Sequence, residues 1–220
     1  MGNKVLENKL LYVTMRNLVF ISLLAVTLLA SAEEPSALPV REMPQKELLA
    51  MLRAGGFILY FRHTSTDFGQ SDEAMTNFAD CEKQRNLTDK GRDEARAIGA
   101  AVKELAIPVG TILSSPFCRT TETAQLAFGR VEQSMDLRGG PVSNDPASYP
   151  ALRKQLSTWP QAETNTILVG HGNPFRSIAG APHLSEGEAA VLQPVGGDKF
   201  QIIARIRLED WKNLIELDRN

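Results

Sequence analysis

Apolar and polar positions alternate along the chain in blocks that predict strands and helices in turn. Continuous runs of β-forming apolar residues, typical of strands buried on both faces, lie at 57–61, 109–113 and 166–169. Between them, apolar residues recur at the three- and four-residue spacing of amphipathic helices, most clearly over 95–105. This alternation predicts an α/β fold of three layers, in which helices cover both faces of a mostly parallel central sheet.

Turn and capping residues suggest where these elements begin and end. Thr88 is a good N-cap for one helix, and Ser115 followed by Pro116 suits the start of the next. Gly196 and Gly197 separate two apolar segments and predict a hairpin. The remaining predicted elements are helices at 46–53, 116–128 and 147–158 and one opening at Pro174, a strand at 131–137, and hairpin strands at 189–195 and 200–208.

The first 32 residues have the pattern of a secretory signal peptide. An uncharged apolar run at 18–30 follows three basic residues and leads to Ala30-Ser31-Ala32, a small-x-small cleavage pattern. The run is shorter than the roughly 20 apolar residues of a transmembrane helix, so we expect no stable membrane span after cleavage; an uncleaved anchor is the alternative. The expected division is a signal peptide at 1–32, a flexible leader at 33–43 and one domain at 44–220, in a protein secreted to the periplasm.

Composition and charge narrow the class of protein further. With 43% hydrophobic and 23% charged residues the chain resembles an ordinary globular protein, which argues against disorder. A formal net charge of −2 with interspersed signs leaves no basic footprint for nucleic acid. Two cysteines exclude a four-cysteine zinc module, and in an oxidising exported compartment Cys81 and Cys118 are expected to form one disulfide rather than stay as two buried thiols.

Arginine and histidine residues that could bind or transfer a group lie where the predicted strands end. Arg62 and His63 follow the first strand, Arg119 follows the loop after the second, and His171 follows the strand at 166–169. Ligands of such sheets bind beyond the carboxyl ends of the strands, so these side chains are expected to converge. Guanidinium groups match the oxygens of a phosphate, and an imidazole can act as a nucleophile. The residues therefore predict a phosphate site with a candidate histidine nucleophile.

At these positions the sequence resembles the histidine phosphatase superfamily, the fold shared with phosphoglycerate mutases. The resemblance covers about residues 57–207. Arg62-His63-Thr64 stands where the family has Arg-His-Gly, and Asn86-Leu87-Thr88 with Gly91-Arg92 and Ala95 is similar to its "LTxxGRxxA" motif. The run from Ser114 to Ala124 is similar to its "SSPxxRxxxTA" motif. Val169-Gly170-His171 matches the family at the second histidine.

The resemblance implies a role for each matched residue. His63 would attack phosphorus and become phosphohistidine, while Arg62, Arg119 and His171 would hold the phosphoryl oxygens and stabilise charge in the transition state. Water would then hydrolyse the intermediate. The implied ligand is a small phosphorylated substrate, and neither a metal nor an organic cofactor is implied.

Two positions depart from the family pattern. Thr64 replaces the usual glycine, and Gly172 stands where the acid-phosphatase branch has an aspartate. The general acid is therefore not evident; Glu188, at the start of the predicted hairpin strand, is the first candidate and Asp145 the second. His183 is interpreted as an incidental loop residue.

Two functions from different classes remain open at this point. The first is an exported phosphomonoesterase that works through phosphohistidine; a mutase is disfavoured because export would separate it from a pool of phosphorylated metabolites. The second is a catalytically weak or inert envelope protein that binds a phosphorylated ligand in the same pocket. Turnover of an aryl phosphate would distinguish them.

Overall fold

The computed structural model describes residues 43–145 and 147–220. The predicted signal peptide at 1–32 and nearly all of the predicted leader lie outside these described residues. Within the described part, no helix has both the length and the apolar character needed to cross a bilayer.

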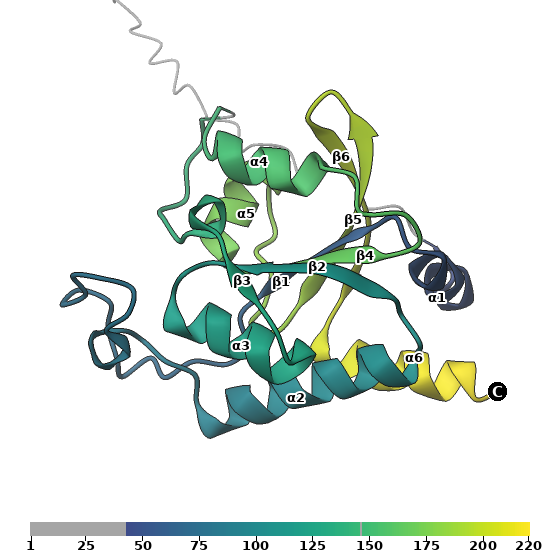
Figure 1. Cartoon of the computed structure of the whole chain (residues 1–220), viewed down its shortest axis with the longest axis horizontal. Helices are drawn as coiled ribbons and strands as arrows, with labels where there is room; N and C mark the ends of the chain where they lie inside the picture. Colours follow the sequence, from purple (N-terminus) through teal and green to yellow (C-terminus); the bar gives the residue numbers. More distant parts are fainter. Residues whose placement is uncertain (1–42, 146) are drawn as a thin grey trace, which may run out of the picture. The chain divides into compact units, whose positions relative to one another are not determined.

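A six-stranded mixed sheet forms the centre of the fold (Figure 1), with strand order β3-β2-β4-β1-β5-β6. Its strands are β1 (Ile58–Arg62), β2 (Val109–Ser114), β3 (Glu132–Gln133), β4 (Asn165–Gly170), β5 (Ala189–Gly196) and β6 (Lys199–Ile206). The four strands from β3 to β1 run parallel, whereas β5 pairs antiparallel with both β1 and β6. The predicted α/β fold with strands at 57–61, 109–113 and 166–169 and a C-terminal hairpin is thus confirmed.

Helices lie on both faces of this sheet, as predicted. They are α1 (Gln45–Ala54), α2 (Asp89–Glu104), α3 (Cys118–Phe128), α4 (Pro150–Ser157), α5 (Gly172–Ala179) and α6 (Leu208–Asp218), with two short 3-10 helices, η1 (Cys81–Lys83) and η2 (Met135–Leu137). Figure 1 shows α2, α3 and α6 below the sheet and α4 and α5 above it.

The alternation of side chains along β1 divides the core in two. Leu59 and Phe61 pack with the buried faces of α1, α2, α3 and α6, and Phe61 stacks on Trp211 of α6 with 6.2 Å between ring centroids. Ile58 and Tyr60 point to the other face and pack with α4 and α5. Because both faces of β1 are covered by helices, apolar side chains are buried at every position of its continuous apolar run.

Three details differ from the sequence-based prediction. The strand predicted at 131–137 is only two residues long, because the Ser134 side chain accepts a hydrogen bond from the Asp136 amide and turns the chain into η2. Helix α3 begins at Cys118 with Phe117 as its N-cap residue, so Ser115 is not its cap. Helix α6 was not predicted, although Leu208, Trp211 and Leu214 have helical spacing.

The sheet register places the functional strand ends side by side. Arg62 at the end of β1 is paired with Gly170 at the end of β4, and the His63 amide donates to the Gly170 carbonyl at 3.1 Å. The Ser115 amide, just after β2, donates to the Val169 carbonyl at 2.9 Å. The chain segments that carry His63, His171 and Arg119 therefore leave the sheet at one edge.

Candidate active site

His63 and His171 lie together in the interior at this edge. Their ring centroids are 5.6 Å apart with the rings edge to face, and the side chains are 2% and 6% exposed. Phe117 packs edge-on against His171 with 4.9 Å between centroids. The two histidines predicted from separate strand ends are thus brought into one site.

The hydrogen bond of His63 fixes which of its nitrogens is free. Nδ1 lies 2.9 Å from the backbone carbonyl of Thr64, and since a carbonyl only accepts, Nδ1 carries the proton and donates it. The pKa of His63 is lowered to about 3, mainly because the ring is buried; the hydrogen bond to the Thr64 carbonyl opposes this shift, and the charges of Arg119, Arg62 and Arg85 add to it. At neutral pH the ring is therefore uncharged, with a lone pair on Nε2.

His171 is held by its backbone as well as by its ring. Ser115 Oγ lies 2.8 Å from Nε2, which is the role this serine takes in place of helix capping. The Tyr60 hydroxyl accepts from the His171 amide at 2.8 Å and donates to its carbonyl at 2.9 Å. A Cβ on Gly170 would lie 2.2 Å from that hydroxyl, so only glycine fits before His171. Burial, followed by the charge of Arg119, places the pKa of His171 well below its ordinary value.

The two predicted arginines flank the histidines, and each has a carboxylate partner. Arg62 donates from Nη1 to the Leu184 carbonyl at 2.8 Å and lies 3.6 Å from Glu186. Arg119, which is 4% exposed, donates from Nη1 to Asp72 at 3.0 Å and to the Arg85 carbonyl at 3.2 Å. Two guanidinium groups beside two uncharged imidazoles can bind and neutralise a phosphoryl group.

These side chains open onto one polar cavity of about 690 Å³. Its lining includes Arg62, His63, Arg119 and His171, as expected. The lining also contains residues that sequence reasoning did not assign to the site: Asp72, Arg85 and His183. Asp72 and Arg85 lie in the loop between β1 and α2, where no periodic pattern distinguished them from ordinary surface charges.

Neither candidate for the general acid lies in this cavity. Glu188 is 4% exposed, but it pairs with Arg205 at 3.2 Å and accepts from the Ser185 amide at 2.7 Å. It immediately precedes β5, where its backbone carbonyl accepts from the Arg62 amide at 3.0 Å, and it is absent from the described cavity lining. Asp145 is an exposed loop residue whose carboxylate accepts from the Ala147 amide. The structure therefore does not bring Glu188 or Asp145 to the histidines, because each is held by partners elsewhere.

Both departures from the family pattern have a local explanation. Thr64 is fully buried, and its hydroxyl lies 3.2 Å from that of Thr123 on α3; its φ is not positive, so the backbone does not require glycine there. At Gly172, a Cβ would lie 2.9 Å from His183 Nδ1 and 3.3 Å from Arg62 Cδ. His183, interpreted from the sequence as an incidental loop residue, thus occupies the space that a larger residue at 172 would need and lines the cavity.

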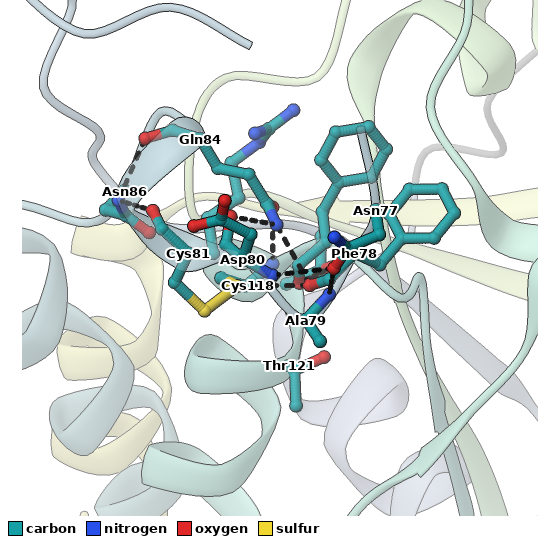
Figure 2. Close-up of a disulfide and its surroundings, with 12 residues drawn as sticks. Asn77, Phe78, Ala79, Asp80, Cys81, Gln84, Asn86, Cys118 and Thr121 are labelled. Atoms are coloured by element: carbon teal, nitrogen blue, oxygen red, sulfur yellow. Dashed lines mark hydrogen bonds between the residues drawn. A yellow bond between two sulfur atoms is a disulfide. The ribbon is translucent and has the colours of Figure 1, made fainter. Parts of the chain in front are cut away.

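A disulfide ties the loop between β1 and α2 to the site. Cys81 and Cys118 are bonded with 5.8 Å between their Cα atoms, which confirms the predicted pairing (Figure 2). Next to it, the Cys118 amide donates to Gln84 Oε1 at 3.0 Å, and the Gln84 amide group donates to the Phe78 carbonyl at 2.9 Å. This loop carries Asp72 and Arg85, so the bond fixes its end directly beside Arg119.

Among the described residues, no group of three or more His, Cys, Asp or Glu side chains is arranged to hold a metal ion. The arrangement as it stands is an anion site with an uncharged imidazole as the candidate nucleophile.

Comparison with known proteins agrees with this geometry. Residues 58–140, which include Arg62, His63 and Arg119, match the histidine phosphatase superfamily (branch 1). No curated protein matches the chain in sequence.

The solved structures that share the fold include a histidine phosphatase and a mycobacterial hydrolase. The protein histidine phosphatase SixA complexed with tungstate has a TM-score of 0.52 and 15% identity over 70% of this chain and 98% of its own. Mycobacterial hydrolase 1 has a TM-score of 0.51 and 14% identity over 68% of this chain and 98% of its own. The chain therefore has the three-layer fold of histidine phosphatases and, over 58–140, their sequence pattern.

Proposed function

We propose that this chain is a histidine phosphatase that hydrolyses a phosphate monoester through a phosphohistidine on His63. The observation that carries the proposal is the state of His63: its Nδ1 proton is committed to the Thr64 carbonyl, and its low pKa keeps Nε2 unprotonated beside Arg62, Arg119 and His171. A nucleophile that is already deprotonated needs no separate base.

The reaction has two displacements at phosphorus. In the first, the Nε2 lone pair forms the N–P bond while the ester P–O bond breaks, and the leaving oxygen takes a proton. In the second, water attacks phosphorus and gives a proton to the carboxylate that protonated the leaving oxygen; the N–P bond breaks, inorganic phosphate leaves and His63 returns to its starting form. Arg62 and Arg119 neutralise the phosphoryl oxygens, whose charge is spread over the transition state.

Asp72 is the proposed proton donor to the leaving oxygen. Of the carboxylates in the described residues, it is the one that lines the cavity. Glu186 is also near, 3.9 Å from His63, but it faces Nδ1, which is the wrong side of the ring for an in-line leaving group. A phosphoryl group bound to Arg119 would take over its guanidinium from Asp72, and the released carboxylate would take up the proton that it then gives to the leaving oxygen.

Export to the periplasm is part of the same proposal. Its support is the signal-peptide pattern at 1–32 together with the Cys81–Cys118 disulfide, since such bonds persist in oxidising compartments. The substrate would then be a phosphate ester that is met outside the cytoplasm.

Turnover of an aryl phosphate tests the central claim. Wild-type protein should release phosphate, and His63→Ala should not, although it folds, because the side chain faces the cavity. A quench at alkaline pH should trap an acid-labile phosphoryl group on wild-type protein alone. An adduct on His171 would reverse the assigned roles. Tight phosphate binding without any turnover would support the phospho-ligand-binding alternative instead.

A further inference from the structure

Arg85 is the one cavity arginine without a carboxylate partner in the described part of the chain. Arg62 pairs with Glu186 and Arg119 with Asp72, whereas within residues 43–145 and 147–220 no ion pair or hydrogen bond involves the Arg85 guanidinium. Its Nε, like those of Arg62 and Arg119, is buried with no hydrogen-bond partner in the described residues. An unpaired guanidinium in a cavity is costly unless a ligand compensates it, so Arg85 is poised for an anion.

The position of Arg85 is held from both sides. Its backbone amide donates to Asp72 at 2.9 Å, and its carbonyl accepts from Arg119 at 3.2 Å. Its guanidinium carbon lies 4.8 Å from the ring centroid of Phe68, a side chain that is 71% exposed. Arg85 thus lies between Arg119, on the side of the histidines, and Phe68, on the exposed part of the loop.

The charge of Arg85 lowers the pKa of both histidines of the site. Burial is the main reason for the low pKa of His63 and of His171, and Arg85 is among the charges that lower both further. Arg85 is nonetheless hydrogen-bonded to neither histidine. Its backbone contacts with Asp72 and Arg119 place it next to the proposed phosphoryl site.

We propose that Arg85 binds a second anionic group of the substrate, so that the preferred phosphate esters carry another phosphate or a carboxylate on the leaving group. This proposal rests on the proposed function for the phosphoryl half of the site. The leaving group must lie across phosphorus from His63, because the displacement is in line. Arg85 lies beside Asp72, the proposed proton donor to the leaving oxygen, which accepts from the Arg85 amide at 2.9 Å. Gln70 and Ser71 of the same loop line the cavity beside Arg85 and offer uncharged polar contacts.

Non-hydrolysable phosphonates test the second anion site without relying on turnover. Methylphosphonate carries one anionic group, whereas methylenediphosphonate and propane-1,3-diyl bisphosphonate carry two at different spacings. Calorimetry on the wild-type protein should show at least one bisphosphonate binding about tenfold or more tightly than methylphosphonate, as expected for one added charged hydrogen bond.

Arg85→Gln should abolish that preference. It should leave methylphosphonate affinity within about twofold of wild type, because the phosphoryl clamp, formed by Arg62 and Arg119, is intact. Arg85→Lys should keep part of the preference, since the charge remains. Arg96→Gln is the matched control: it also removes one positive charge, but from an exposed residue of α2 that pairs with Asp93. It should bind all three probes like wild type.

Equal binding of the three probes by wild-type protein would overturn the inference. So would an Arg85→Gln variant that loses methylphosphonate and bisphosphonate affinity by the same factor, since Arg85 would then belong to the phosphoryl clamp itself. The aryl phosphate assay separates the two proposals. Turnover without a bisphosphonate preference refutes only the second anion site, whereas a preference that depends on Arg85 without turnover refutes only the catalytic proposal.

Discussion

The hydroxyl of Tyr60 binds both backbone polar groups of His171, accepting from its amide at 2.8 Å and donating to its carbonyl at 2.9 Å. Tyr60 lies on β1, two residues before Arg62, whereas His171 follows β4. The strand that presents the proposed nucleophile therefore also sets the position of the second histidine.

Tyr60→Phe should reduce both activity and stability. The ring can stay stacked on Phe175, with 4.8 Å between centroids, but the buried amide and carbonyl of His171 lose their partner. We expect the free energy of unfolding to fall by about 1–3 kcal/mol and kcat by about tenfold or more, because His171 is no longer held in place. Urea unfolding and steady-state kinetics measure the two effects. Unchanged kcat in a destabilised variant would show that Tyr60 does not position His171 for catalysis.

Protein stability should fall as the pH drops from about 6.5 towards 3. Both histidines of the site have lowered pKa values in the folded state, that of His63 to about 3, mainly because they are buried. Below pH 6.5 the unfolded chain therefore binds more protons than the folded one, and stability rises with pH in this window. Each buried histidine contributes up to about 1.4 kcal/mol per pH unit.

Urea unfolding between pH 5 and 6.5, above the titration of ordinary carboxylates, measures this slope. His63→Asn should remove about half of what the two histidines contribute. A slope that is the same in wild type and variant would mean that His63 is not buried as a neutral group.

Arg119→Lys should behave as a severe change although it keeps the charge. Lysine loses the planar fork that can contact two phosphoryl oxygens at once, so kcat/KM should fall about 10²-fold or more. Arg96→Lys on the exposed face of α2 is the matched control and should be silent. Near-normal kcat/KM in Arg119→Lys would remove Arg119 from the phosphoryl clamp.

Asp72→Asn should affect alkyl phosphates more than aryl phosphates. An alkoxide leaving group needs a proton far more than a phenolate does, so loss of a proton donor should cost about 10²-fold for alkyl esters and much less for nitrophenyl phosphate. The measurement is the ratio of kcat/KM for the two ester classes. If Asp72→Asn lowers both by the same factor, the carboxylate serves only to hold Arg119.

Removal of the disulfide should lower stability and disturb the cavity together. Replacing Cys81 and Cys118 by serine opens a loop of 37 residues and should cost about 2–4 kcal/mol. KM should rise as well, because the loop that carries Asp72 is no longer fastened beside Arg119. Mass spectrometry without reductant should find no free thiol in wild-type protein; two thiols that alkylate fully after denaturation would contradict the bond.

Much of the site could be predicted because its key residues stand at strand ends. A run such as 57–61 identifies a buried strand on its own, and the carboxyl edge of a parallel sheet is where its ligands bind. His63 and His171 therefore could be assigned to one site before any coordinates, as could Arg62 and Arg119. The cysteine pairing followed from the small number of cysteines and the expected export.

The acid could not be assigned in the same way. Glu188 lies at the start of the predicted hairpin strand and is a reasonable candidate from the sequence. In the fold, however, its carboxylate forms an ion pair with Arg205, a residue distant along the chain. Asp72 lies in a loop without periodicity, and only the folded loop shows that its carboxylate meets Arg119.

What the sequence by itself determined is the alternation of strands and helices up to the hairpin, without α6, and the residues at the ends of the strands β1, β2 and β4, because local hydrophobic spacing encodes these directly. The tertiary structure alone decided which polar groups of the loop between β1 and α2, and of the segment between α5 and β5, reach the cavity. These positions depend on hydrogen bonds and ion pairs between distant segments of the chain. As a result, Asp72, Arg85 and His183 line the cavity, whereas Glu188 forms an ion pair with Arg205.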